Sequence, residues 1–94
     1  MIKYVPPTPE DLNRLKAQLG YSGEQMAELA SVSGGQQWRK YTGGATPRDL
    51  GMHILFFMAA RLVLPPEQLQ AIADKMAEIG AEVDGTALAG HGQK

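Results

Sequence analysis

The sequence predicts an all-α fold of five helices, and three observations support this prediction. First, three polar motifs have the form of helix starts: T-P-E-D at 8–11, S-G-E-Q at 22–25 and T-P-R-D at 46–49. Each puts a hydroxyl residue at the N-cap and a side chain that can reach back to it three residues later. Second, apolar residues recur at helical spacing after each motif. Third, no stretch beyond, at most, residues 2–5 alternates polar and apolar residues as a strand does.

The first three helices are predicted to be short and closely connected. The first covers residues 9–19 and ends at the glycine that follows, and the second covers residues 23–30. The third covers residues 35–42 and is closed by a pair of glycines. Trp38 and Tyr41 are three positions apart on this third helix, so they share a face. An aromatic pair at this spacing favours a place in the core over a role in stacking on a base.

Two longer helices follow, at residues 47–64 and 65–79. The fourth is apolar nearly all round, whereas a helix with one buried face shows a polar stripe. Either the other helices wrap it completely, or part of it forms a subunit interface. The fifth begins at a double proline and ends before Gly80. The helical pattern fades beyond it, so we expect one domain over residues 1–83 and a flexible C-terminal tail over 84–94.

Composition and charge restrict the function further. The chain has 94 residues, no cysteine and a net charge of −1. Its longest apolar stretch is far shorter than the roughly 20 residues of a membrane span, and no signal-peptide pattern opens it. We therefore expect a cytoplasmic protein that does not bind membranes. Residues 1–48 carry six basic and four acidic side chains, whereas residues 49–94 carry three basic and six acidic ones.

Catalytic and metal-binding patterns are not found. His53 and His91 have no second ligand at a suitable spacing, so neither predicts a metal site. No histidine accompanies a nucleophile, and the glycine pairs at 34–35 and 43–44 lack the context of a nucleotide-binding loop. We therefore expect no enzyme activity, no cofactor and no bound metal.

The polar face of the third predicted helix is the candidate functional site. Glutamine and arginine are the side chains best suited to hydrogen-bond base edges in the major groove of DNA. A solvated polar face is the alternative interpretation, and the flanking pattern of a short helix and a tight turn favours DNA reading. The candidate base-reading residues are Gln36, Gln37, Arg39 and Lys40.

Residues 9–60 resemble the lambda-repressor-like, Cro/C1-type (XRE) helix-turn-helix family. The resemblance rests on L-x-x-L-x-x-x-L-G at 12–20, S-x-E-x-M-A-E-L-A at 22–30 and W-R-K-Y-T-G-G at 38–44. It implies a helix-turn-helix at the second and third helices and a transcriptional regulator that reads operator DNA in the major groove. One extra glycine, at 34 or 35, is needed to align the aromatic pair. The phosphate-contacting residues that the resemblance and the helix ends suggest are Ser22, Thr42, Gly43 and Arg48.

Two expectations about partners follow. Two recognition helices must lie about 34 Å apart to read a two-fold DNA site, so we expect a homodimer through the fourth and fifth helices bound to double-stranded DNA. The alternative is a protein-interaction module of the same fold, antitoxin-like or inhibitory, with little or no DNA binding. The near-neutral charge and the apolar fourth helix favour that alternative.

Overall fold

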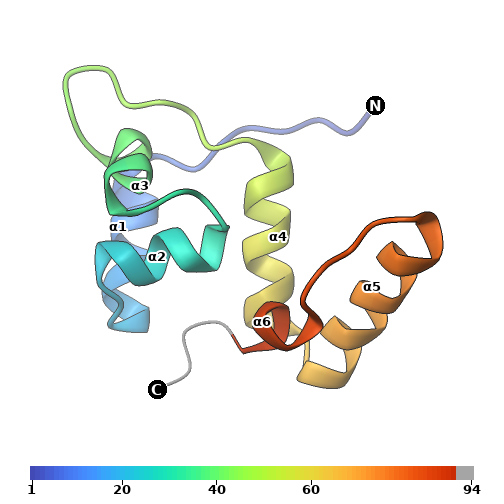
Figure 1. The fold of residues 1–94 in the computed structure, drawn as a ribbon. Coiled ribbons are helices and arrows are strands. Elements are labelled where there is room, and N and C mark those ends of the chain that lie inside the picture. Colours follow the sequence, from blue (N-terminus) through green and yellow to red (C-terminus); the bar gives the residue numbers. More distant parts are fainter. Residues whose placement is uncertain (91–94) are drawn as a thin grey trace.

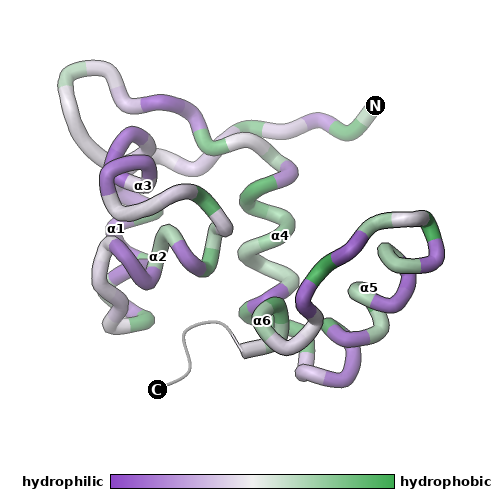
Figure 2. The backbone as a smooth tube through the Cα atoms, in the orientation of Figure 1, coloured by the Kyte–Doolittle hydropathy of each residue, from purple (hydrophilic) through white to green (hydrophobic). Residues whose placement is uncertain are grey.

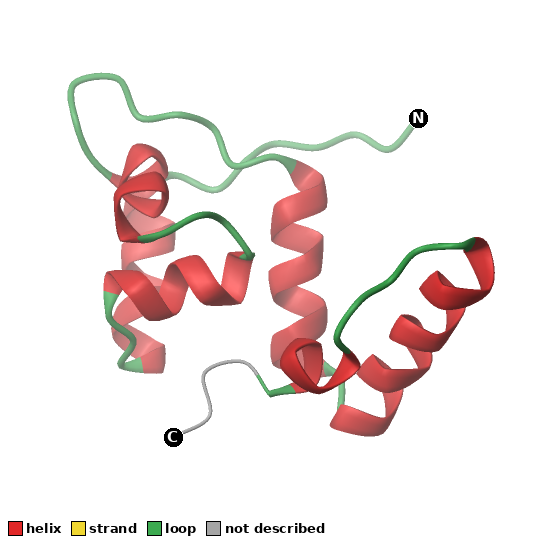
Figure 3. Cartoon of the chain, viewed as in Figure 1, coloured by secondary structure: helices red, strands yellow, loops and turns green. Residues whose placement is uncertain are grey.

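A computed structural model of the chain describes residues 1–90, and that range contains six helices and no strand (Figures 1 and 3). The prediction of an all-α fold is therefore confirmed, with one helix more than the five expected. In chain order the helices are α1 (Pro9–Leu19), α2 (Gly23–Ala30), α3 (Gly35–Thr42), α4 (Met52–Val63), α5 (Pro66–Ile79) and α6 (Gly85–Ala89).

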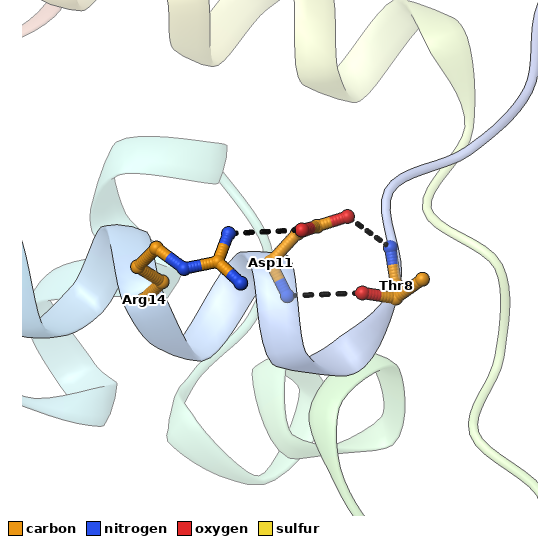
Figure 4. A network of polar contacts seen from close by, with 3 residues as sticks. All are labelled: Thr8, Asp11 and Arg14. Atoms are coloured by element: carbon orange, nitrogen blue, oxygen red, sulfur yellow. Dashed lines mark hydrogen bonds and ion pairs between the residues drawn. The ribbon is translucent and has the colours of Figure 1, made fainter.

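Helices α1 to α3 have the bounds that the sequence predicts, and the capping boxes of α1 and α2 are formed as expected. At the start of α1, the Thr8 hydroxyl accepts from the Asp11 N–H and the Asp11 carboxylate accepts from the Thr8 N–H, both at 3.0 Å (Figure 4). Arg14 donates to the same carboxylate at 3.0 Å. These hydrogen bonds, that from the Thr8 backbone first, hold the pKa of Asp11 below its ordinary value. The box at Ser22 and Gln25 is formed in the same way at α2.

The main core lies between α1, α2, α3 and the part of α4 up to Met58. Its largest fully buried side chains are Trp38, Met26, Leu29, Leu50 and Met58. The rings of Trp38 and Tyr41 have centroids 6.1 Å apart and are tilted by 56°, a favourable arrangement for an aromatic pair. Helix α2 packs against both α3 and α4, and α1 packs against α3. The four-helix cluster thus fixes α3 through its two aromatic side chains.

Helix α4 begins at Met52, so the predicted start at Pro47 is wrong. The T-P-R-D motif instead lies in the loop 43–51, which is held in place by longer-range contacts. The Arg48 N–H donates to the Lys40 carbonyl at 2.8 Å, and Leu50 is buried in the main core. The Tyr4 hydroxyl donates to the Leu50 carbonyl at 2.6 Å. These contacts outweigh the local helix-start signal.

The tail expected over residues 84–94 is also wrong in part, because residues 85–89 form α6. The Asp84 carboxylate caps this helix by accepting the N–H groups of Thr86 and Ala87, at 3.0 and 3.2 Å. Leu88 is buried against Leu69 and Ala73 of α5 in a second, smaller core cluster. The helix has only five residues and its apolar anchor is a single leucine, so no helical periodicity reveals it. Residues 91–94 of the predicted tail, including His91, lie outside the described residues.

Arg61 joins the two clusters. Its side chain is only 7% exposed and donates to the main-chain carbonyls of Glu28 and Leu29, at 2.8 and 3.1 Å, and of Ala87 and Leu88, at 3.1 and 3.0 Å. Burial lowers the pKa of this guanidinium, while the negative charge of Glu28 and the proximity of Tyr21 oppose that shift. A cation at the carbonyl ends of two helices is in the position that helix dipoles favour.

Much of the apolar surface of α4 and α5 is open to solvent. Phe56 is 74% exposed and Val63 is 77% exposed, although both lie in an apolar helix (Figure 2). The alternative in which the other helices wrap α4 completely is therefore wrong. Within residues 1–90, none of the helices has the length and apolar content needed to cross a membrane.

Candidate nucleic-acid interface

The segment from α2 to α3 has the geometry of two short helices joined by a four-residue turn. The C-cap of α2 is Ser31, the residue after the helix, whose backbone is left-handed, with φ 58° and ψ 44°. A left-handed backbone is unfavourable for a residue other than glycine. At this position the Ser31 N–H donates to the Glu28 carbonyl and so ends the helix. Val32 packs against the main core. The turn thus redirects the chain while keeping one apolar anchor, as the sequence predicts.

The eight residues of α3 divide into a buried and an exposed face. Trp38 is 1% exposed and Tyr41 is 6% exposed, which confirms their predicted place in the core. Gln36 and Lys40 are exposed and four positions apart, so they share the outer face. Arg39 is also exposed and lies at the edge of that face next to α2. The structure therefore brings three of the four predicted base-reading residues to one surface.

Gln37 lies differently from its neighbours. It is half-buried and one helical step of about 100° away from Gln36, toward the face of Tyr41. A side chain at this edge reaches the surface with less freedom than Gln36 has. Among the glutamines, Gln36 is thus the better placed for a base edge.

Glu24 caps the start of α3 from the neighbouring helix. Its Oε2 accepts the Gly35 N–H at 2.9 Å, so a carboxylate of α2 satisfies one of the unpaired amides at the α3 N-terminus. A Cβ on residue 35 would lie 2.6 Å from this oxygen. Gly35 therefore has a structural role, since the absence of a side chain makes room for the cap.

Arg39 is folded toward the N-termini of both helices. Its Nη1 lies 3.8 Å from the position that a Cβ on Gly23 would occupy and 3.4 Å from the corresponding position on Gly35. The guanidinium is thus close to the first backbone amides of α2, where helix geometry favours an anion. This position suits a contact with a phosphate better than a contact with a base edge deep in the groove.

The other residues predicted to contact phosphates lie in two places, at the N-terminus of α2 and from the end of α3 into the loop 43–51. Ser22 is exposed at the α2 N-terminus, and its oxygen accepts the Gln25 N–H at 3.1 Å, which leaves the hydroxyl proton for a further partner. Arg48 is exposed in the loop 43–51, tied through its backbone to the end of α3. Thr42 is half-buried, and the Gly43 N–H already donates to the Arg39 carbonyl at 2.9 Å. Ser22 and Arg48 are therefore better placed than Thr42 and Gly43.

Two residues with a part in this surface were missed by sequence reasoning. Tyr4 fixes the extended N-terminal segment against the loop 43–51 (Figure 1), and the carboxylate of Glu24 holds α3 against α2. Neither role leaves a local signal, because the partners are 46 and 11 residues away in the chain. Only knowledge of how α2 packs against α3 could have suggested the role of Glu24.

Within residues 1–90, no group of three or more His, Cys, Asp and Glu side chains is arranged to hold a metal ion. Comparison of the chain with protein-family models, with curated proteins and with solved structures gives no match. The chemistry of the surface must therefore be argued from its own residues.

Proposed function

We propose that the protein binds double-stranded DNA through α3, with α2 and the loop 43–51 positioned over the phosphates, and acts as a transcriptional regulator of the lambda-repressor-like kind. The observation that carries this proposal is the outer face of α3, which presents Gln36, Lys40 and Arg39 together on a helix held by two buried aromatic rings. A helix presented in this way fits the width of the major groove.

The contacts divide into two groups. Gln36 and Lys40 read base edges, with Gln37 at the margin of the same face. Arg39, Ser22 and Arg48 hold phosphates, and Arg39 does so beside the first amides of α2. Phosphate contacts position the protein without carrying sequence information, so this division predicts different consequences for substitutions in each group.

The test is fluorescence anisotropy of the protein with the DNA that lies upstream of its own coding sequence and with a scrambled duplex, at two salt concentrations. Gln36→Ala is expected to cost roughly 1–3 kcal/mol on the upstream DNA and to relax the preference at one base pair. Arg48→Ala is the matched comparison, since it is expected to weaken binding to both duplexes alike and to lower the salt dependence. Equal binding of both duplexes by the unaltered protein would contradict specific recognition.

A homodimer is part of this proposal. Met52, Phe56, Ala59 and Val63 fall four, three and four positions apart along α4, which puts them in one apolar stripe. The stripe is exposed at Phe56, Ala59 and Val63, and the small Ala59 at its centre lets a second helix approach closely. Pairing of two chains along this stripe would present two recognition surfaces to a two-fold DNA site.

A protein-interaction module without DNA binding is the second candidate, and one observation favours it. The Glu24 carboxylate lies at the N-terminus of α3, where it repels an approaching phosphate. Salt distinguishes the two candidates, because neutralisation of phosphates releases counterions and contact between apolar surfaces does not. DNA affinity that is absent even at low salt would favour this second candidate.

A further inference from the structure

We propose that the apolar groove between α4 and α5 binds an amphipathic helix of a partner protein, one with basic residues beside its apolar face. The groove has a volume of about 720 Å³ and lies away from the outer face of α3. It does not rest on the proposed DNA binding, since it uses none of the residues that would contact DNA. Its walls are α4 and α5, which lean apart, and α6 closes one end (Figure 1).

The walls of the groove are apolar and accessible. Phe57 contributes from α4, Ile72 and Met76 from α5, and Val83 from the segment before α6. Three of these four side chains are more than a third exposed, and Phe57 is half-buried. A flexible methionine beside an aromatic ring adapts to the shape of an inserted side chain. This is the composition of grooves that receive the apolar face of a helix.

The apolar side chains of the groove stay partly exposed to solvent, and this favours a helix over a small ligand. A small ligand is usually buried over 70–90% of its surface, which an open groove does not provide. An amphipathic helix needs burial on one face only and keeps its other face in water.

The charge at the rim selects a basic partner. Glu28 and Asp84 line the groove from α2 and from the start of α6. Arg61 and His53 are the basic side chains among the described lining residues, and the guanidinium of Arg61 is engaged with carbonyl groups of α2 and α6. A lysine or arginine beside the apolar anchors would therefore meet negative charge at both edges.

A second copy of this chain does not supply such a helix within residues 1–90. Helices α1 and α3 carry basic residues, but their apolar faces are buried in the main core at Leu12, Trp38 and Tyr41. Helix α5 carries Lys75 together with three acidic residues. Helix α4 has an exposed apolar stripe, but its Arg61 is engaged with carbonyl groups, and α2 and α6 carry no basic residue. The partner is accordingly a different protein.

The probe is a labelled amphipathic peptide of about 14 residues, the length of α5, with leucine and phenylalanine on one face and lysine on both flanks. The same peptide with glutamate in place of lysine is its counterpart. Fluorescence anisotropy with the full-length chain is expected to show binding of the lysine peptide, at least about tenfold tighter than the glutamate peptide.

Two apolar-to-polar substitutions in the groove keep the net charge constant. Met76→Gln and Ile72→Asn are each expected to weaken the lysine peptide by about tenfold. Ile79→Asn is the matched control, because Ile79 is 78% exposed on the same helix and does not line the groove. Glu28→Gln is expected to weaken the same peptide by about threefold, and Glu67→Gln, the same charge change outside the groove, to leave it unchanged. Circular dichroism of each variant checks that the fold is kept.

Three results would overturn the proposal. In the first, the lysine peptide does not bind or the glutamate peptide binds as tightly. In the second, the groove substitutions have no more effect than Ile79→Asn. In the third, the chain forms a dimer that Met76→Gln dissociates and the lysine peptide does not displace. The last result would show a second copy in the groove. DNA binding by the same variants is measured separately, and its loss or retention does not bear on these outcomes.

Discussion

The guanidinium of Arg61 makes hydrogen bonds to four main-chain carbonyl groups, two in α2 and two in α6. In the sequence this residue only interrupts an apolar stretch, and the carbonyl groups that it binds are 26 to 33 residues away. A charged side chain in an apolar helix can face solvent or a buried set of acceptors, and composition does not distinguish these. Its structural role could therefore not be predicted.

Arg61→Met tests that role. The substitution keeps an unbranched apolar side chain but removes every donor, which leaves buried carbonyl groups without partners. The free energy of unfolding is expected to fall by about 2–5 kcal/mol, as measured by urea denaturation. Arg14→Met is the control, since Arg14 and its partner Asp11 are both exposed and little change is expected there. Equal effects of the two substitutions would contradict the role given to Arg61.

Glu24 provides the second prediction at this scale. Glu24→Gln keeps an oxygen to accept the Gly35 N–H but removes a negative charge beside the proposed phosphate contacts. DNA affinity at low salt is expected to rise by about threefold to tenfold, since a unit charge at this range contributes about 0.6–1.4 kcal/mol. Glu28→Gln makes the same charge change at the other end of α2 and should raise DNA affinity less. Anisotropy with the same duplex measures both, and no difference between them would argue against a phosphate near Glu24.

At the scale of elements, helices with complete local signals could be predicted from the sequence and elements held by distant contacts could not. The capping boxes of α1 and α2 and the aromatic pair of α3 lie within a few residues, and the predicted bounds of all three helices are confirmed. The loop 43–51 contains an equally good capping motif, yet it stays non-helical because Leu50 enters the core. Likewise, Gln36 is exposed on α3 and Gln37 is half-buried, a difference set by packing and not by residue type.

Tyr4 anchors the N-terminal segment to this loop, and its removal provides a prediction at the element scale. Tyr4→Phe loses the 2.6 Å hydrogen bond to the Leu50 carbonyl, at an expected cost of about 1 kcal/mol of unfolding free energy. Denaturation at neutral pH measures this loss. A change within error would show that the segment does not depend on the hydroxyl.

The same residue predicts a dependence on high pH. Burial, and then the negative charge of Asp49, raise the pKa of Tyr4 above its ordinary value of 10.0. The contribution of the neutral hydroxyl to stability is therefore complete below pH 10.0 and is lost as the pH rises through the higher value in the folded state. Tyr4→Phe should remove this part of the alkaline loss of stability, so the two denaturation profiles should converge above that range.

At the scale of the whole molecule, polar and apolar surfaces are separated. The outer face of α3, the α2 N-terminus and the loop 43–51 present the polar and basic residues proposed to contact DNA. The stripe on α4 and the groove toward α5 present apolar side chains, and Figure 2 shows α4 as a mainly apolar segment. This arrangement allows one part of the molecule to contact DNA while another contacts protein.

Ala59→Glu tests the proposed dimer. It puts a charge at the centre of the α4 stripe at a residue that is exposed and does not line the groove. Sedimentation equilibrium at micromolar concentration is expected to give twice the 10.1 kDa of one chain for the unaltered protein and a single chain for the variant. Ala71→Glu, an equivalent change at an exposed residue of α5, should leave the dimer intact. A monomeric unaltered protein would rule out the dimer.

The hydrogen bonds of Arg61 also determine how this small chain loses its structure. The second core cluster has only three buried residues, too few for α5 and α6 to persist alone. Because one guanidinium donates to carbonyl groups of both α2 and α6, detachment of α6 exposes Arg61 and leaves it held by α2 alone. Melting of the C-terminal helices is therefore expected to loosen the contact between α4 and α2.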